Sequence, residues 1–170
     1  MPRLRELNEF DLEVINKWRN DPELISNLGA PFRYINYEVD KNWYNSYMNN
    51  RNTNVRCSIV DESDSILGLV SLVSIDYINR SAVFNIMIGD KANHDKGIGS
   101  FAVKEMLQHA FNNMNLQRVE LGVLEDNARA IHLYEKCGFK CEGRKRKAKY
   151  KNGKFVDLLI YAILKEEFIN

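Results

Sequence analysis

The stretch that decides the fold runs from His94 to Phe101 and reads H-D-K-G-I-G-S-F. Gly97 and Gly99 stand one residue apart, after a run of strand-forming residues and before a segment with helical apolar spacing. A glycine-rich turn that opens a helix binds anions, because free backbone N–H groups and the helix dipole point at the ligand. Glycine also lets the backbone approach that ligand closely, and Lys96 adds a positive charge. The pattern predicts a phosphate cradle, although so short a motif also fits a plain strand-to-helix turn.

Apolar residues on both sides of this turn indicate the neighbouring elements. From Ile98 onward they recur every three or four residues, which predicts a helix over 98–114. Three strands of an antiparallel meander are expected before the turn, over 56–60, 66–76 and 81–89. After the helix, the sequence predicts a strand over 118–123, a helix over 127–136 that Gly138 ends, and strands over 139–150 and 155–164. The last two strands are joined by Asn152-Gly153, a pair typical of two-residue hairpin turns.

The first third of the chain is predicted to form a short strand and two helices. A strand over 4–7 is followed by Asn8 and Asp11, which resemble a capping box, and the helix should stop near Asn20 because Asp21 precedes Pro22. Residues 24–31 fit a loop or a short helix, and 37–47 fit a second helix. The apolar face of the first helix is predicted to contain Phe10, Val14, Ile15 and Trp18. That of the second helix is predicted to contain Val39, Trp43, Tyr44 and Tyr47. The aromatic residues of this third could line a substrate pocket, but most are expected in the core: Phe32, Tyr34, Tyr37, Trp43, Tyr44 and Tyr47.

Length and composition are those of a globular protein with one sizeable core. The chain has 170 residues, of which 45% are hydrophobic and 28% charged, with a net charge of +1 that points neither to nucleic acid nor to a membrane. No signal peptide or membrane span is visible, so a cytoplasmic location is expected. The three cysteines fit a reducing compartment. Cys137 and Cys141 with His132 lack a further ligand pair, so no metal is expected and the cysteines are predicted to be buried thiols.

Two motifs give the chain a resemblance to the GNAT superfamily of acetyl-CoA-dependent N-acetyltransferases. The first is the loop His94–Gly99, which resembles the family's pyrophosphate loop with His in place of the usual Gln or Arg. The second is N-A-R-A-I-H-L-Y-E-K-C-G-F, Asn127–Phe139, close to the family's N-x-x-A-x-x-L-Y-x-x-x-G-F. The resemblance implies one α+β domain over 1–170, with a mixed, mostly antiparallel sheet of about seven strands flanked by about four helices. It also implies acetyl-CoA as co-substrate and a direct transfer to a primary amine.

The resemblance also implies a set of cofactor contacts: Met87, Ile88, His94, Lys96, Gly97, Ile98, Gly99, Ser100, Phe101, Asn127 and Tyr134. Asn127, Ile131 and Tyr134 are spaced four and three apart, so they share one face of the predicted helix. Asn127 and Tyr134 are separated by about 10 Å along the axis, which permits a pantetheine arm to contact both. The alternative is that Asn127 is only an N-cap and Tyr134 only a core residue.

The reaction requires three groups, which deprotonate the amine, polarise the thioester carbonyl and protonate the leaving sulfur. Tyr134 is the candidate acid for the sulfur, and a backbone N–H around Met87 and Ile88 is implied at the carbonyl. The residue that deprotonates the amine is not identified by the resemblance. Many family members have Glu at a strand position that Val83 occupies here. Asn85 shares a strand face with Val83 and is a candidate for substrate binding, but an amide cannot serve as the base. Glu120 on the neighbouring strand, or a chain of water molecules, could take that proton.

Three features of the sequence bear on the identity of the acceptor amine, and they leave more than one class of acceptor open. The run W-R-N-D-P-E, Trp18–Glu23, resembles enzymes that acetylate nucleotide-linked amino sugars, and it is also similar to spermidine and ribosomal-protein N-terminal acetyltransferases. Gly29-Ala30 precede Pro31 where the spermidine branch has paired glutamates, which favours the amino sugar nucleotide. Arg144 and Arg146 are expected on one face of a strand and could hold an anionic acceptor, although a basic edge strand also protects against pairing with other chains.

A different class of function is also compatible with the sequence. Without the usual strand Glu, the chain could be a silent acyl-CoA-binding module, or an adaptor whose basic strand over 144–151 binds nucleic acid. Nucleic acid and membrane partners are not expected from the net charge. A homodimer is possible.

Overall fold

The computed structural model describes residues 1–168. Its regular elements, in chain order, are β1 (Arg3–Glu6), α1 (Leu12–Arg19), α2 (Pro22–Ser26), α3 (Tyr37–Asn49), β2 (Val55–Val60), β3 (Ile66–Asp76), β4 (Ser81–Ile88), α4 (Ile98–Gln108), β5 (Arg118–Leu124), α5 (Ala128–Lys136), β6 (Lys140–Lys151) and β7 (Lys154–Leu164). A π-helical turn, His109–Asn113, continues α4, so the predicted helix over 98–114 is confirmed in two parts. Among these described residues no helix is long and apolar enough to cross a membrane.

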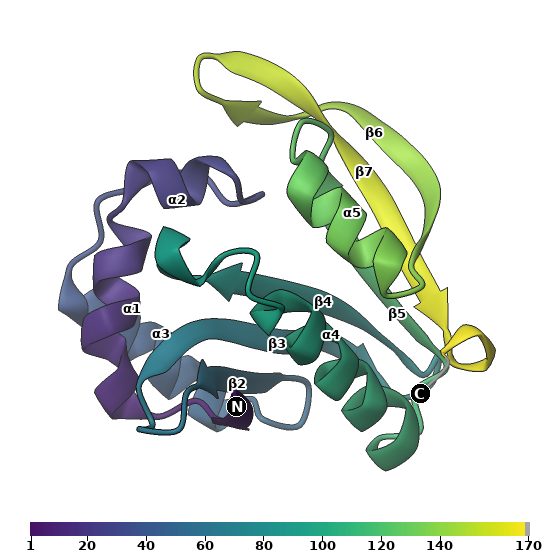
Figure 1. The fold of residues 1–170 in the computed structure, drawn as a ribbon, viewed down its shortest axis with the longest axis horizontal. Coiled ribbons are helices and arrows are strands. Elements are labelled where there is room, and N and C mark those ends of the chain that lie inside the picture. Colours follow the sequence, from purple (N-terminus) through teal and green to yellow (C-terminus); the bar gives the residue numbers. More distant parts are fainter. Residues whose placement is uncertain (169–170) are drawn as a thin grey trace.

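Seven strands form one sheet in the order β1-β2-β3-β4-β5-β7-β6. The meander of β2, β3 and β4 is antiparallel, as predicted, and only β4 and β5 pair in parallel. That pairing covers three residue pairs, Ser81↔Arg118 to Val83↔Glu120, and the two strands then diverge into a V (Figure 1). The mixed α+β class and the seven strands are confirmed, while the structure has five α-helices rather than about four.

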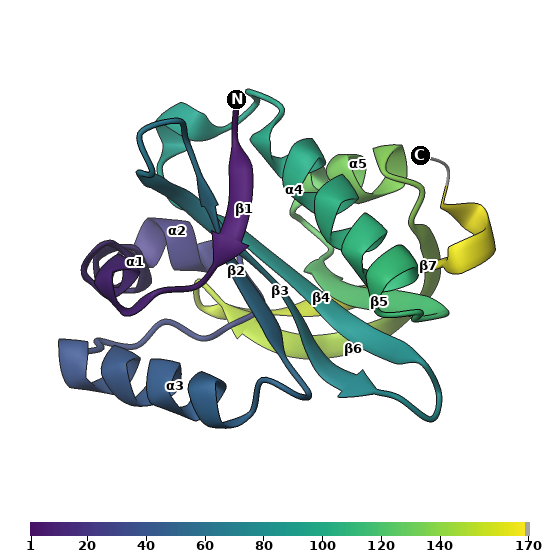
Figure 2. The same ribbon diagram turned by 90° about the horizontal axis from the view of Figure 1, so that it is seen from below.

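Helices cover both faces of the sheet (Figure 2). On one face, α4 and α5 close the main core, which includes Leu72, Phe84 and Met106. On the other face, α1 and α3 form a smaller core that includes Ile15 and Tyr47. Burying a side chain of this size contributes about 2 kcal/mol, so the two cores hold the sheet from both sides. The rigid scaffold fixes the positions of the open ends of β4 and β5.

Local signals set the ends of several helices, and α2 begins at Pro22, two residues before the loop or short helix predicted over 24–31. The side chain of Asn8 and the carboxylate of Asp11 form the expected capping box. Asp21 caps α2, and Pro22 occupies the first helical position, where its missing N–H costs nothing. Gly138 follows α5 with φ +96°, a conformation that side chains with a Cβ rarely adopt.

The aromatic residues of the first third are less buried than predicted. Tyr47 is in the core, but Tyr34 is 90% exposed and Tyr37 and Phe10 are also exposed. Phe10 lies in a 3₁₀ turn before α1, where the guanidinium of Arg5 stacks on its ring at 4.8 Å. The prediction that most of this aromatic set lies in the core is therefore wrong for Tyr34 and Tyr37, whereas Trp43 and Tyr44 pack against the core that contains Tyr47. A helical spacing indicates which residues share a face but not whether another element covers that face.

Strand β6 is interrupted by a bulge, so the alternation predicted over 144–151 is wrong. Lys145 pairs with Leu158 and Lys149 with Val156, so four steps along β6 match two steps along β7. Lys147 has φ +50°, and its N–H donates to the Asp157 carboxylate at 2.8 Å. Beyond the bulge Lys151 is buried, although it belongs to the basic strand predicted over 144–151.

Candidate active site

The V between β4 and β5 opens into a cleft of about 1080 Å³. One end of the cleft lies at the amino end of α4, and α5 forms a wall beside it (Figure 1). The other end lies between α2 and the face of β2, β3 and β4 that α1 and α3 cover. We refer to these parts as the cradle end and the acceptor end. The divergence of the two strands opens this space. It also leaves the backbone groups that face the gap without a partner on the opposite strand.

The cradle end has the geometry that the glycine motif predicts. The first helical bond here is donated by the Phe101 N–H to the Gly97 carbonyl at 3.0 Å, so the N–H groups over 98–100 have no helical acceptor. No side chain caps this helix. Gly97 has φ +79°, and a Cβ built there would meet no protein atom within 4 Å, whereas one at Gly99 would lie 3.1 Å from Leu133. These observations fit a pyrophosphate held by backbone N–H groups.

The other predicted loop residues divide into those that face the cleft and those that do not. Ser100 lines the cleft, whereas Lys96 does not. Ile98 and Phe101 pack into the core, so only their backbone is available to a ligand. His94 lines the cleft, where burial, and next the charge of Arg129, lower its pKa. His94 is therefore neutral at pH 7 and can donate a hydrogen bond, but it adds no charge for a phosphate.

The backbone of β4 presents free groups to the cleft at every second residue. The Gly89 N–H donates to the Leu67 carbonyl of the β3 side at 3.0 Å, so the Ile88 carbonyl in the same peptide points away from β3. Because backbone groups alternate along a strand, Ile88 and Ile86 face the opening while Met87 faces β3. Met87 and Ile88 were both predicted to contact the cofactor. The N–H of Ile88 faces the cleft, whereas the backbone groups of Met87 face β3 within the sheet.

Tyr134, on α5, is a mostly buried residue of the cleft wall. It is 7% exposed, packs edge-to-face against Phe84 at 6.3 Å between ring centroids, and lines the cleft. Within residues 1–168, no side chain or backbone group forms a hydrogen bond with its hydroxyl. Burial, with a smaller contribution from Cys137, raises the pKa of Tyr134 to about 12. The hydroxyl therefore keeps its proton at neutral pH and has it free to donate.

Asn127 begins α5 and also lines the cleft. Its side-chain oxygen accepts from the Ala130 N–H at 3.1 Å, which is the N-cap role set out as an alternative. Its amide nitrogen donates to the Asn27 carbonyl, just after α2, at 3.0 Å. One amide N–H remains for a ligand, so capping and cofactor binding are compatible.

Comparisons with known proteins agree with this geometry. A model of the acetyltransferase (GNAT) domain matches residues 3–140. This chain belongs to the GNAT family. It is an acetyl-CoA-dependent N-acetyltransferase, as the sequence motifs indicated.

Two curated relatives and one solved structure illustrate the similarity. Spermidine N(1)-acetyltransferase of Vibrio cholerae is 32% identical over 98% of this chain and 95% of its own length. Acetyltransferase PseH of Campylobacter jejuni is 28% identical over 79% of this chain and 80% of its own. The crystal structure of the Vibrio cholerae spermidine N-acetyltransferase in complex with CoA and spermine superposes with a TM-score of 0.93, at 31% identity, covering 99% of this chain and 98% of that one.

The candidate bases of this GNAT enzyme are poorly placed. Glu120 is paired with Arg118 at 3.1 Å and does not line the cleft. Val83 lines it and carries no titratable group. Asn85 is exposed in the cleft, as expected for a residue that contacts substrate. Of the residues described, no carboxylate on β4 or β5 borders the cleft beside Tyr134.

The segment after α2 forms one wall of the acceptor end in this GNAT fold. The ammonium of Lys151, 7% exposed, donates to the Ile25 carbonyl at 2.9 Å and to the Ala30 carbonyl at 2.6 Å. Together with the bond from Asn127 to Asn27, these contacts tie residues 25–30 to α5 and to the β6–β7 hairpin. Figure 1 shows α2 opposite α5, on the other side of the V.

Lys151→Met should lower the free energy of unfolding by about 2 kcal/mol, because two carbonyls lose their donor. It should also raise KM for the acceptor, since the wall at residues 25–30 is loosened. Denaturant titration and acceptor kinetics measure the two effects. Lys145→Met, which removes an exposed lysine of the same strand, is the control. Equal stability of the two variants would contradict the structural role of Lys151.

The two arginines proposed from the sequence for an anionic acceptor lie outside the cleft. Arg144 is bound by Glu125 at 3.1 Å and by Asp157 at 2.8 Å. Neither Arg144 nor Arg146 lines the cleft, and Arg146 lies within the bulge of β6. In this part of β6, the basic residue that lines the cleft is Lys149.

Sequence reasoning missed Arg56 at the acceptor end, and it favoured the core over a pocket for Trp43. Arg56 begins the predicted strand over 56–60, and Trp43 was assigned to a core-facing stripe. Both line the cleft, and the guanidinium of Arg56 stacks on the Trp43 ring at 5.0 Å. A charged residue within an apolar strand was the available signal, but the sequence does not show which elements enclose it.

Proposed function

We propose that this enzyme acetylates the primary amine of a small molecule that enters the acceptor end of the cleft. The observation that carries the proposal is the continuity of the cleft from Gly97 past Tyr134 to Trp43. A phosphate cradle at one end and a separate space at the other suit a long thioester and an amine that meet at Tyr134. Direct transfer needs both ligands in one site at the same time.

Acetyl-CoA, when bound, supplies the activated acetyl group as a thioester. The backbone N–H groups over 98–100 hold its pyrophosphate, and the N–H of Ile88 donates to the thioester carbonyl. Tyr134 donates its proton to the departing thiolate sulfur. The new amide bond forms as the carbon–sulfur bond breaks, and the amine's proton passes to water, because the residues at Val83 and Asn85 cannot accept it.

The comparisons favour a polyamine over the amino sugar nucleotide that the sequence favoured. The arginines that supported a nucleotide lie outside the cleft, which removes that argument. Spermidine is therefore a required member of any acceptor panel. The chain nevertheless lacks the paired glutamates of the spermidine branch at Gly29-Ala30, so the acceptor has to be measured. The homodimer that the sequence leaves open stays untested.

CoA release should be detectable when acetyl-CoA is offered with a panel of primary amines and free thiol is measured. The panel includes spermidine, ω-amino acids, amino sugar phosphates and an N-terminal peptide. We expect release above the rate of thioester hydrolysis with at least one small amine. Tight binding of acetyl-CoA without release on any member would contradict the proposed function and favour the silent module.

A further inference from the structure

The floor of the acceptor end contains a polar row that crosses three strands. Arg56 of β2 pairs with Ser71 of β3, and Ser71 pairs with Asn85 of β4. Side chains of directly paired residues lie on the same face of a sheet, and all three line the cleft. The neighbouring floor residues Leu69 and Met87 are apolar, so the row is the polar part of this surface.

The cation at the far end of this row lacks a counter-ion within the chain. The Nε of Arg56 is buried, and among residues 1–168 no acceptor lies within hydrogen-bond distance of it. No carboxylate in the described chain pairs with its guanidinium. Arg19 provides the contrast, because it also stacks on Trp43 but is paired with the fully buried Asp40.

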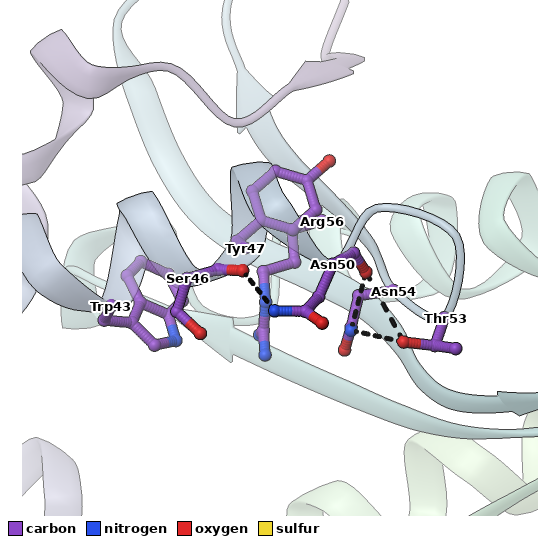
Figure 3. A pocket seen from close by; sticks show the side chains of 7 residues that line it. All are labelled: Trp43, Ser46, Tyr47, Asn50, Thr53, Asn54 and Arg56. Atoms are coloured by element: carbon purple, nitrogen blue, oxygen red, sulfur yellow. Dashed lines mark hydrogen bonds between the residues drawn. The ribbon is translucent and has the colours of Figure 1, made fainter.

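Arg56 separates the main cleft from a smaller polar pocket of about 190 Å³. Figure 3 shows its guanidinium beside Trp43, Ser46 and Asn50. Hydrogen bonds link Asn50 to Ser46 and to Asn54, whereas none of the residues drawn is bonded to Arg56. The amide and hydroxyl groups of this pocket can solvate an oxyanion but cannot neutralise the arginine.

A half-buried guanidinium without an anionic partner is costly, because burial removes water that would otherwise solvate the charge. Burial lowers the pKa of Arg56, with Tyr47 acting in the opposite direction, but the side chain stays protonated. A planar guanidinium binds carboxylate or phosphate through two parallel hydrogen bonds. A ligand with such a group would supply the missing partner.

We propose that Arg56 binds an oxyanion of the acceptor, so that the acceptor is an amine that also carries a carboxylate or a phosphate. This inference rests on the proposed function and names the substrate class within it. The strands β2 and β4 are two strand spacings apart, which is about 10 Å. The amine and the oxyanion of the acceptor are therefore separated by several bonds. An α-amino acid is too short to reach both, whereas an ω-amino acid of five methylenes fits.

The other charges of the acceptor end do not favour a polycation. Four acidic residues line the whole cleft: Asp21, Glu23, Asp90 and Asp95. Asp21 caps α2 and Glu23 is paired with Lys91, so both are partly engaged. None of the four belongs to the row that Arg56 shares with Ser71 and Asn85. A second ammonium placed at the far end of the row would meet Arg56 and be repelled.

The test uses two acceptors of equal length that differ in one charge. The ω-amino acid ε-aminocaproate and the diamine cadaverine both have five methylenes, and aminopentyl phosphate distinguishes phosphate from carboxylate as the source of the oxyanion. We expect kcat/KM to be higher for one of the anionic amines than for cadaverine or spermidine. Arg56→Gln should lower that value on the order of 100-fold, the loss of two charge-assisted hydrogen bonds. Affinity for acetyl-CoA should not change.

Arg51→Gln is the matched control, because it removes the same charge from an exposed arginine that lies outside the cleft. Calorimetry of the anionic amines with the CoA-loaded enzyme gives a readout that needs no turnover. The proposal is overturned if wild type prefers spermidine or cadaverine, or if Arg56→Gln binds the anionic amines as tightly as Arg51→Gln does. If Arg56→Gln does not fold, the preference of the wild type between the matched acceptors decides alone. If none of the amines tested leads to release of CoA, the proposed function is contradicted. Calorimetry of the anionic amines would still decide the role of Arg56.

Discussion

Tyr134→Phe should lower kcat on the order of 100-fold while the affinity for acetyl-CoA changes little. The substitution removes only the hydroxyl, so the ring contacts with Phe84 and Phe139 remain. The leaving sulfur then departs without its proton donor. Steady-state kinetics with the best acceptor, together with calorimetry of acetyl-CoA, separate the two quantities.

The pH dependence of the reaction provides a second measurement on Tyr134. Because burial raises the pKa of Tyr134 to about 12, its acid form is fully present at neutral pH and is lost only as the pH approaches that value. The acid limb of the rate profile therefore belongs to deprotonation of the amine. Tyr161→Phe is the control, since its hydroxyl binds Glu135 at 2.9 Å outside the cleft. If Tyr134→Phe keeps the kcat of the wild type, Tyr134 is not the proton donor and serves only in packing.

Gly97→Val should weaken acetyl-CoA binding on the order of 100-fold, the loss of about two charge-assisted hydrogen bonds. The new side chain would project into the open space of the cradle, where no protein atom lies within 4 Å, and would exclude the pyrophosphate. Gly99→Val is a less clear test, because its Cβ would also press on Leu133 at 3.1 Å. Calorimetry with acetyl-CoA measures the effect.

Gly153→Val controls for the backbone strain of this substitution. Gly153 has φ +81°, almost the same as Gly97, and its Cβ would also meet open space, but it lies in the β6–β7 hairpin outside the cleft. Both variants should lose similar stability from a side chain at positive φ. Only Gly97→Val should lose cofactor affinity. Equal affinities in the two variants would rule out the cradle.

Local signals in the sequence were sufficient for most element boundaries. The capping box at Asn8 and Asp11, Pro22 at the start of α2 and Gly138 after α5 each act within a few residues. Such signals concern backbone groups that must be satisfied locally, so they can be read without knowing the fold. The glycine motif at 97–99 belongs to the same kind, because a helix start presents its N–H groups wherever it lies.

Solvent exposure and side-chain direction were less predictable. Trp43 was assigned to the core, and Arg144 and Arg146 to the acceptor, from periodicity along single elements. Two extra residues in β6 broke that periodicity, and Trp43 both packs against the smaller core and lines the cleft beside Arg56 of β2. A period shows which residues share a face, but burial depends on what packs against that face.

The sequence by itself determined the family, the seven strands, the glycine turn at Gly97 that opens α4 and the position of Tyr134 on α5. These features depend on contiguous residues, whose spacing sets the backbone geometry. Only the tertiary structure decided what shapes the acceptor end: the divergence of β4 from β5, the contacts of Lys151 with the segment after α2, and the row from Arg56 to Asn85. Those arise from register between strands and from contacts across more than a hundred residues, as between Lys151 and Ile25. Hydrogen bonds and desolvation act through space, and the charge balance of the cleft is therefore set by the fold.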